Sequence, residues 1–376
     1  MIKKIIVYLY NLKKRLLFNK KIRGIHTRLQ NNAILQNIPK NVKESHFRIW
    51  SPLSTTKNPK WLEVYSSISK IVSEKYIPES IYYTIVEPVL NNKQVVKSFS
   101  EKNLYPIIYP SIYFPVAILS NIEGCFYNKE YKNVKIDKNS LNKLLKKHDK
   151  FVIKPSLDSG GGFKVDFFRN IKGRYMNQDG QEFSLEYIQS RYRKNYIIQE
   201  LIKQQDFFSR FNPSSVNTVR IFTYRSVITE RIIPLHAVLR VGKEGHEVDN
   251  QASGGLACGI NMKTGKLKSF AINKTGDIFT RINQINLKGQ PLLIPRFREM
   301  VEISKQIATR NYYARLLGLD FTLDSQENIK LIEVNNNNNE INFYQMTNGP
   351  LFGEYTQEII DFCIDHPISF VLDYEV

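Results

Sequence analysis

Residues 317–338 read LGLDFTLDSQENIKLIEVNNNN, and this stretch decides the fold. Two apolar runs flank the polar turn 324–328, a pattern that predicts an antiparallel strand pair. Asp320 lies in the first run. Glu333 and Asn335 lie two apart in the second, so their side chains share one face. Carboxylate and amide oxygens suit Mg²⁺ when triphosphate oxygens and water complete its shell. We therefore predict a metal site here. The alternative is a solvated hairpin, which the apolar neighbours of Glu333 disfavour.

A glycine-rich loop precedes this pair in the chain. Residues 151–165 read FVIKPSLDSGGGFKV, which predicts a strand carrying Lys154 and then a flexible loop. One cation and several free backbone N–H groups are suited to surround a phosphate. The loop lacks the GxxxxGK[ST] pattern of a Walker loop. The alternative is a solvent-facing hairpin with a glycine-rich tip, because matches of this kind have many false positives.

Two arginines lie on neighbouring apolar strands, Arg220 within SSVNTVRIF and Arg240 within PLHAVLRVG. An unpaired charge on such a strand is costly. An anionic ligand between the two guanidinium groups would relieve that cost. The alternative is that each arginine pairs with a local carboxylate such as Glu230 or Asp249. Upstream, Glu200 follows an apolar strand. Its carboxylate is placed to accept a hydrogen bond from a ribose hydroxyl, and the backbone at the end of the strand is placed to bind an adenine.

Strands and helices alternate irregularly, and hairpins are frequent in the second half of the chain. Apolar periodicity predicts an amphipathic helix over residues 298–317, ended near Gly318. Ser140 is the expected N-cap of a helix that follows it. This mixture predicts an α+β fold, with no internal repeat and a single low-complexity patch at 335–339.

Positive charge is concentrated at the N-terminus. The chain has 376 residues and a net charge of +19, and the first 43 residues hold eleven Lys or Arg and no acid. Apolar residues at 5–10 and 16–18 are interleaved with these cations. This pattern favours an amphipathic helix in an anionic membrane interface through residues 1–30. A helix docked on the body of the protein is the alternative. Nucleic acid is not an expected partner, since no recognition motif accompanies the charge.

Composition excludes several other classes. The sequence contains no run of about 18 apolar residues, which is the length that a helix needs to span a bilayer. Cys125, Cys258 and Cys363 form neither a disulfide framework nor a CxxC site, so we expect a reducing, cytoplasmic location, peripheral on the inner face of the membrane if the N-terminus binds there. Six scattered histidines disfavour a zinc site.

Together the three blocks, in this order and spacing, resemble the ATP-grasp superfamily, and most of all its sugar-transfer-associated family. The resemblance covers about residues 98–365. It implies an ATP-grasp fold of two α+β subdomains clasping ATP, preceded by a mainly helical region. The expected parts are a basic amphipathic segment (1–43), an N-terminal region (44–117), a lid subdomain (118–198) and a C-terminal subdomain with the metal site (199–376).

The resemblance also implies site residues. The nucleotide-contacting positions are Lys102 (with Glu101 replacing the usual Asp), Lys154, Ser159, Gly160, Gly161, Gly162, Gln199, Glu200, Leu201, Ile202 and Asn250. The implied magnesium ligands are Asp320, Glu333 and Asn335, which are expected to hold two Mg²⁺ ions, and the expected nucleotide is ATP. The family's arginine before the metal Asp is replaced by Leu319, so Arg240 or Arg220 is expected to serve the charged intermediate.

The implied activity is an ADP-forming carboxylate–amine (or thiol) ligase that works through an acyl phosphate. The family context suggests a sugar or amino-acid substrate in surface polysaccharide biosynthesis. D-Alanine dipeptide synthesis is disfavoured, because Asn336–Asn339 and Glu340 stand where those ligases have Pro-Gly. Two alternatives stay open: a non-catalytic, membrane-associated ATP-grasp scaffold, and a kinase that stops at phosphorylation.

Overall fold

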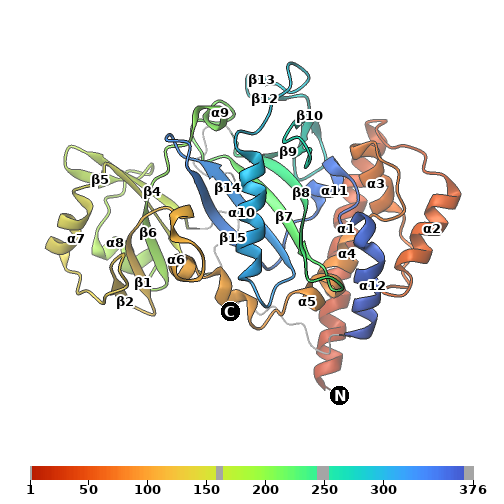
Figure 1. Cartoon of the computed structure of the whole chain (residues 1–376), viewed down its shortest axis with the longest axis horizontal. Coiled ribbons are helices and arrows are strands. Elements are labelled where there is room, and N and C mark those ends of the chain that lie inside the picture. The colour runs from red at the N-terminus through yellow and green to blue at the C-terminus, as the bar shows by residue number, and fades with distance from the viewer. Residues whose placement is uncertain (1, 158–163, 244–253, 368–376) are drawn as a thin grey trace.

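A computed structural model describes residues 2–157, 164–243 and 254–367. Helices form the N-terminal part, and two antiparallel sheets follow it (Figure 1). The six-stranded sheet lies at one end of the molecule, the seven-stranded sheet at the centre, and the helices formed by residues 2–81 at the other end. The α+β architecture predicted from the sequence is confirmed.

The N-terminal part consists of helices joined by short turns. Its helices are α1 (Ile2–Asn31), α2 (Lys40–Trp50), α3 (Lys60–Ser69), α4 (Glu79–Ile81), α5 (Glu87–Leu90) and α6 (Tyr105–Ile108). A π-helical turn, Tyr82–Val86, joins α4 to α5, and a 3-10 turn, Lys102–Leu104, precedes α6.

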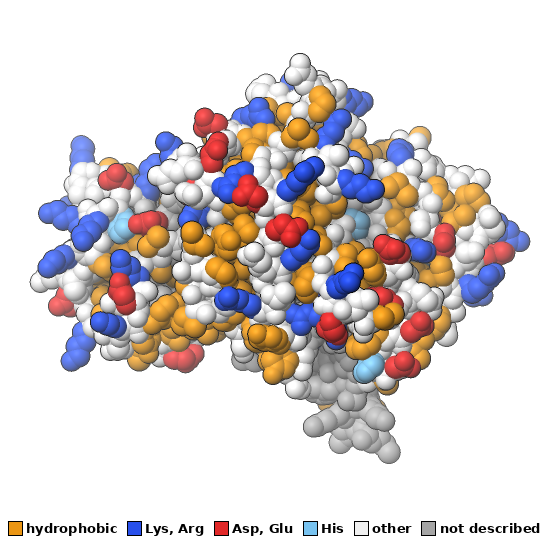
Figure 2. Space-filling view, in the orientation of Figure 1, with side chains coloured by type: hydrophobic (Ala, Val, Ile, Leu, Met, Phe, Trp, Pro, Cys, Tyr) orange, Lys and Arg blue, Asp and Glu red, His pale blue; other side chains and the backbone are white. Residues whose placement is uncertain are grey.

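The six-stranded sheet has the order β2-β1-β6-β3-β4-β5. Its strands are β1 (Ala117–Ile122), β2 (Cys125–Tyr127), β3 (Lys150–Pro155), β4 (Asp166–Ile171), β5 (Arg174–Met176) and β6 (Tyr196–Glu200). The helices α7 (Lys138–Leu145) and α8 (Leu185–Arg191) contribute Leu141 and Ile188 to its core. Asp137, rather than the expected Ser140, is the N-cap of α7, and Ser140 completes a capping box with it. Lys and Arg side chains are numerous on the visible surface of this end (Figure 2).

The seven-stranded sheet has the order β11-β10-β9-β8-β7-β14-β15. Its strands are β7 (Thr218–Arg225), β8 (Ile232–Val241), β9 (Leu256–Ile260), β10 (Leu267–Ile272), β11 (Ile278–Phe279), β14 (Leu316–Leu323) and β15 (Ile329–Asn335). The short pair β12 (Arg281–Ile282) and β13 (Ile285–Asn286) stands beside it, with α9 (Asp206–Ser209), α10 (Phe297–Thr309), α11 (Asn342–Asn348) and α12 (Thr356–Asp365) in the same part of the chain.

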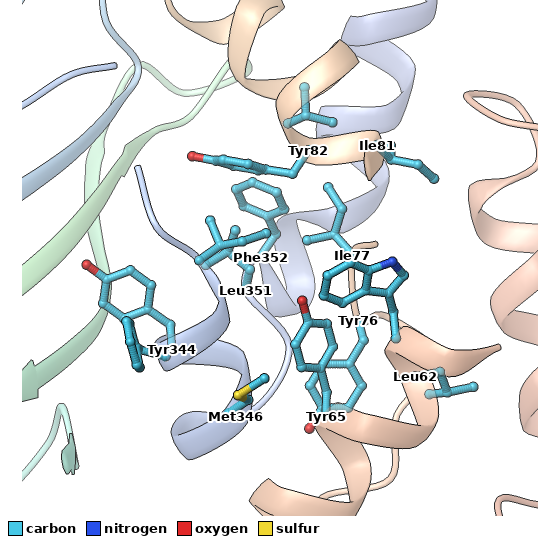
Figure 3. Packing of buried hydrophobic residues seen from close by; sticks show 14 of the residues in the cluster. Leu62, Tyr65, Tyr76, Ile77, Ile81, Tyr82, Tyr344, Met346, Leu351 and Phe352 are labelled. Atoms are coloured by element: carbon cyan, nitrogen blue, oxygen red, sulfur yellow. The ribbon is translucent and has the colours of Figure 1, made fainter. Parts of the chain in front are cut away.

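The two faces of this central sheet differ. One face is apolar and packs against α10 through residues such as Ile221, Leu239 and Leu319. The other face packs against the N-terminal helices and α11 at one end, through Phe222 and Tyr224. Figure 3 shows part of this second core, where Tyr65, Met346, Leu351 and Phe352 lie together. Toward the start of β7 the same face carries a charged side chain instead of aromatic ones. Arg220 lies two residues before Phe222, and side chains two apart on a strand share a face.

The expected helix over 298–317 is too long. The helix α10 ends at Thr309, and β14 already begins at Leu316. Apolar residues at 316–323 are buried throughout, and a continuous apolar run fits a buried strand as well as a helix. The strand pair predicted around residues 324–328 is present as β14 and β15.

Helix α1 has two different halves. In its second half Ile22, Ile25 and Leu29 are buried in the core, and Lys21 forms an ion pair of 2.6 Å with Glu79. In its first half the large apolar side chains are exposed: Ile5, Ile6, Tyr8, Leu9, Leu12, Leu16 and Leu17. Leu16 and Ile25 are nine residues apart, about two and a half turns, so they lie on opposite sides of the helix. The apolar face therefore changes sides along α1.

Candidate ATP-binding and metal site

Four strands of the central sheet, β7, β8, β14 and β15, bring opposite charges together. Asp320 on β14 is the direct cross-strand neighbour of Arg220 on β7 and of Glu333 on β15. Its carboxylate accepts from Nε and Nη2 of Arg220, both at 2.6 Å, and from Nη1 of Arg240 at 3.0 Å. Asp320 is 3 % exposed, so these charge-assisted bonds form in a nearly dry environment.

The carboxylate partner of Arg220 and Arg240 is Asp320, whereas the sequence suggested a local carboxylate such as Glu230 or Asp249. Glu230 pairs with Arg315 at 2.8 Å instead, and Asp249 lies outside the described residues. The carboxylate that neutralises Arg220 and Arg240 is the one predicted to bind metal. The pairing depends on the register between strands that are 100 residues apart in the chain.

Glu333 forms the second ion pair of the site. Its carboxylate lies 3.0 Å from Nζ of Lys102, and about a quarter of its side chain (24 %) is exposed. Burial alone would raise the pKa of Glu333, but the charges of Lys102, Arg220 and Lys154 and the Lys102 hydrogen bond lower it to about 2. The carboxylate is therefore ionised at any physiological pH.

Lys154 reaches the same place from the other sheet. It lies on β3, and burial, together with repulsion from Lys102, lowers the pKa of its ammonium to about 8, although Glu333 opposes the shift. The backbone N–H of Lys102 donates to the Ser156 carbonyl at 3.0 Å, which holds the 3-10 turn against the end of β3. Two lysines and one carboxylate from three segments thus form one cluster between the sheets.

The predicted metal ligands lie on one face, as the spacing required. The Nδ2 of Asn335 donates to the Gly318 carbonyl at 3.2 Å and to Asp320 at 3.4 Å. In the described part of the chain, no three His, Cys, Asp or Glu side chains form a metal-binding group by themselves. Two carboxylates and an amide fit a hard divalent cation that takes its other oxygens from phosphate and water. Such an ion would share Asp320 with Arg220, and Glu333 with Lys102.

The predicted nucleotide hinge is the end of β6. Gln199 is buried, the N–H of Glu200 donates to the Val116 carbonyl at 3.0 Å, and the segment continues through Leu201 and Ile202 without regular structure. The Glu200 carboxylate lies 3.3 Å from Nδ1 of His148, and 46 % of its side chain is exposed. An exposed carboxylate at a strand end is free to meet a ligand, and the adenine and ribose roles stay predictions.

Several predicted residues cannot be placed. Ser159, Gly160, Gly161 and Gly162 of the glycine-rich loop, and Asn250, lie outside the described residues.

Sequence reasoning missed two residues that border the site. Tyr344 on α11 is buried, and its hydroxyl has no hydrogen-bond partner in the described part of the chain. Burial and the charge of Asp320 raise the pKa of the Tyr344 hydroxyl, whereas the charges of Arg220 and Arg240 lower it. All three charged side chains therefore act on this hydroxyl. In Figure 3 the hydroxyl points away from the other labelled side chains.

Asn339 is the second missed residue. Both polar atoms of its buried amide lack a partner among the described residues, and a Cβ built on Gly318 would lie 2.7 Å from its Oδ1. The amide therefore covers the sheet beside Arg220. Its backbone is fixed, because its N–H donates to Glu87 at 2.8 Å and its carbonyl accepts from Tyr83 at 2.9 Å. The sequence placed Asn336–Asn339 where related ligases have Pro-Gly, but it assigned no individual role to Asn339.

The geometry and the sequence comparisons point to one class. The chain has an ATP-grasp fold, with Lys154 on the six-stranded sheet, which is the sheet expected to form the lid, near Glu333 on the central sheet. The sequence matches the family described as sugar-transfer associated ATP-grasp over residues 72–360, more than half of the chain. The protein therefore belongs to this family, as the resemblance predicted.

Solved structures give distant matches. They include the ATP-grasp ligase PsnB with a minimal precursor (11 % identity, TM-score 0.37, 73 % of this chain and 62 % of that chain). Others are D-alanine-D-alanine ligase from Coxiella burnetii (9 %, 0.38, 73 % and 60 %) and biotin carboxylase from Campylobacter jejuni (11 %, 0.40, 73 % and 47 %). The chain thus covers less than two thirds of each. The search of curated proteins found no match.

Among the described residues, no helix is both long enough and apolar enough to cross a membrane.

Proposed function

We propose that the protein is an ATP-dependent, ADP-forming ligase that joins a carboxylate to an amine or thiol through an acyl phosphate. The observation that carries this proposal is the cluster of Lys102, Lys154 and Glu333 between the two sheets, beside the ion-paired Asp320. Burying charges is costly even when they are paired, and clusters of buried ionisable groups are therefore enriched at functional sites. Phosphoryl transfer needs this kind of preorganised charge more than it needs covalent chemistry.

The roles follow from position. Lys154 and Lys102 would bind the outer phosphates, and residues 199–202 would hold the nucleoside; the resemblance to the family assigns Ser159–Gly162 to the same phosphates. Asp320, Glu333 and Asn335 would hold Mg²⁺, expected as two ions. When bound, this metal supplies Lewis-acid neutralisation of the phosphate oxygens.

The arginines would act on the other side of the transferred phosphate. Arg240 and Arg220 are held by Asp320, and the residue before Asp320 is Leu319, so no arginine precedes it on the strand. We assign Arg240 to the developing charge of the acyl phosphate and Arg220 to its support. Closure of the lid sheet would exclude water from this intermediate.

The family's description supports a substrate class. A sugar acid, or an amino acid joined to a glycan in surface polysaccharide biosynthesis, would supply one reactant. The Tyr344 hydroxyl and the Asn339 amide border the place where such a substrate would lie, and both have unmet hydrogen-bonding capacity.

The test separates a ligase from a kinase and from a scaffold. ADP release would be followed with a panel of sugar acids, with and without amine acceptors. A ligase releases ADP and inorganic phosphate and forms a product that contains both substrates. A kinase gives a stable phosphorylated product without an acceptor, and a scaffold gives no turnover. Either of these last results would contradict the proposal.

We also propose that the first half of α1 binds an anionic membrane surface, which would place the enzyme beside lipid-linked sugars. The support is that Ile5, Leu9, Leu12 and Leu16 form an exposed stripe, with lysines and arginines at 13–15 around it. Apolar burial and attraction to anionic lipids act together in such a helix.

This second proposal has its own test. Vesicle co-sedimentation would compare the wild type with Leu9→Ser/Leu16→Ser, on vesicles with and without anionic lipid. We expect wild-type binding that weakens at high salt and in the variant. Equal binding of both proteins, unaffected by salt, would overturn it. The variant keeps the docked half of α1, so the fold should be preserved.

A further inference from the structure

Both tryptophans of the chain, Trp50 and Trp61, line one cavity among the N-terminal helices. Its volume is about 180 Å³. That volume corresponds to roughly six liquid waters, enough for a small ring-shaped ligand. The walls come from α1, α2, α3, α4 and the loop at residues 51–58. None of the lining residues belongs to the charged site on the central sheet.

The two indoles have unmet hydrogen-bonding capacity. Trp50 is 2 % exposed and Trp61 1 %, and neither Nε1–H has an acceptor among the described residues. Buried tryptophans usually find a partner for this group, and each exception calls for a reason. Two such donors beside one cavity point to an acceptor that occupies it.

The polar lining defines what kind of acceptor fits. No aspartate or glutamate is among the lining residues, which offer serine, threonine and asparagine side chains and one cation, Lys57. Two possible donors are already engaged: Nδ2 of Asn58 donates to Asn19 at 3.2 Å, and Nδ1 of His46 lies 2.9 Å from the Glu74 carbonyl. Burial lowers the pKa of His46, so its ring adds no charge. The polar groups that remain to meet a ligand in this cavity are hydrogen-bond donors and one positive charge, that of Lys57.

We propose that this cavity binds a single acidic sugar, a pyranose that carries a carboxylate. A pyranose offers several hydroxyl and ring oxygens to the indole N–H groups and hydroxyl side chains, and its flat C–H face suits the aromatic walls. Its carboxylate would pair with Lys57. The exposed apolar half of α1 ends at Leu17, two residues before Asn19, so this sugar site would lie beside the surface proposed to meet lipid. The inference does not depend on the ligase chemistry.

Intrinsic fluorescence tests this directly, because the only two tryptophans are both in the cavity. Full-length protein would be titrated with glucuronic acid and with glucose, without nucleotide, and ligand-detected NMR would run in parallel. We expect a saturable fluorescence change and NMR contacts with glucuronic acid. Lys57 is exposed, and an ion pair at an exposed lysine contributes up to about 1 kcal/mol, so the Lys57→Met variant should bind it about twofold to fivefold more weakly. Lys129→Met, at an exposed lysine, is the matched control.

The outcomes separate the sugar site from the ligase. Glucuronic acid should bind equally well to Lys154→Met, which removes the proposed phosphate contact. Loss of binding in that variant, with Lys57→Met unaffected, would assign the sugar to the ligase site and overturn the proposal. No saturable signal by either method would mean that the cavity holds only water, and would also overturn it. Trp50→Phe and Trp61→Phe, with folding checked by circular dichroism, should each weaken binding.

Discussion

The charged face of the central sheet and the outer half of α1 depart from ordinary burial in opposite ways. On the sheet, Asp320, Arg220 and Arg240 are charges withdrawn from water. On α1, Leu9 and Leu16 are apolar side chains left in water. The first arrangement stays stable because each charge is paired, whereas the side chains of the second remain exposed among the residues that the structure describes. This difference is the basis of our two proposals, that the sheet face meets a charged ligand and that the outer half of α1 meets an apolar surface.

The largest effect should come from removing the lid lysine. Lys154→Met should lower turnover by about 10²–10³-fold, since one preorganised charge at the transferring group typically contributes that much. The protein should remain folded, because burial already disfavours this ammonium. Steady-state ADP release gives the measurement. Lys150→Met, on the same strand at an exposed position, is the matched control and should keep wild-type turnover.

Breaking the buried pair should affect stability as well as activity. Asp320→Asn leaves Arg220 without its carboxylate, and removing one partner of a buried pair typically costs about 3–5 kcal/mol. Urea unfolding would measure it. Glu302→Gln, in the exposed pair with Lys305, should change stability by no more than about 1 kcal/mol. An equally small loss for Asp320→Asn would show that the pair is not formed in solution.

The pH dependence of nucleotide binding should report the state of Lys154. Its pKa is about 8, so the ammonium is present below that pH and is lost as the pH rises through it. ATP affinity at constant Mg²⁺ should therefore fall above about pH 8. Lys102→Met removes the neighbouring positive charge and should move this fall to higher pH. An unchanged midpoint in that variant would contradict the coupling between the two lysines.

The smallest effect concerns the two halves of α1. Leu16→Ala should change the free energy of unfolding by no more than about 0.5 kcal/mol, because the side chain is exposed. Ile25→Ala, in the docked half, should cost about 2–5 kcal/mol through the cavity that it leaves. Thermal or urea unfolding of both variants measures the difference. Similar losses would mean that the outer half also packs against the body.

Local patterns predicted a large part of this molecule. The alternation around Glu333 gave the strand pair and its shared face, and Lys154 followed from one short strand and its loop. The partner of Arg220 could not be predicted, because it depends on the register between β7 and β14. The end of α10 was missed because buried strand residues continue its apolar pattern. Tyr344 and the tryptophan cavity arise only when helices distant in sequence pack together.

The central claim is an acyl phosphate formed with release of ADP, and a trapping experiment tests it most directly. The protein would be incubated with ATP, Mg²⁺ and candidate sugar acids, and hydroxylamine would then be added. Our account predicts a hydroxamate in amounts equal to the ADP formed, and neither product with Lys154→Met. AMP and pyrophosphate as the nucleotide products would contradict the account, even if Lys154 proved essential for turnover.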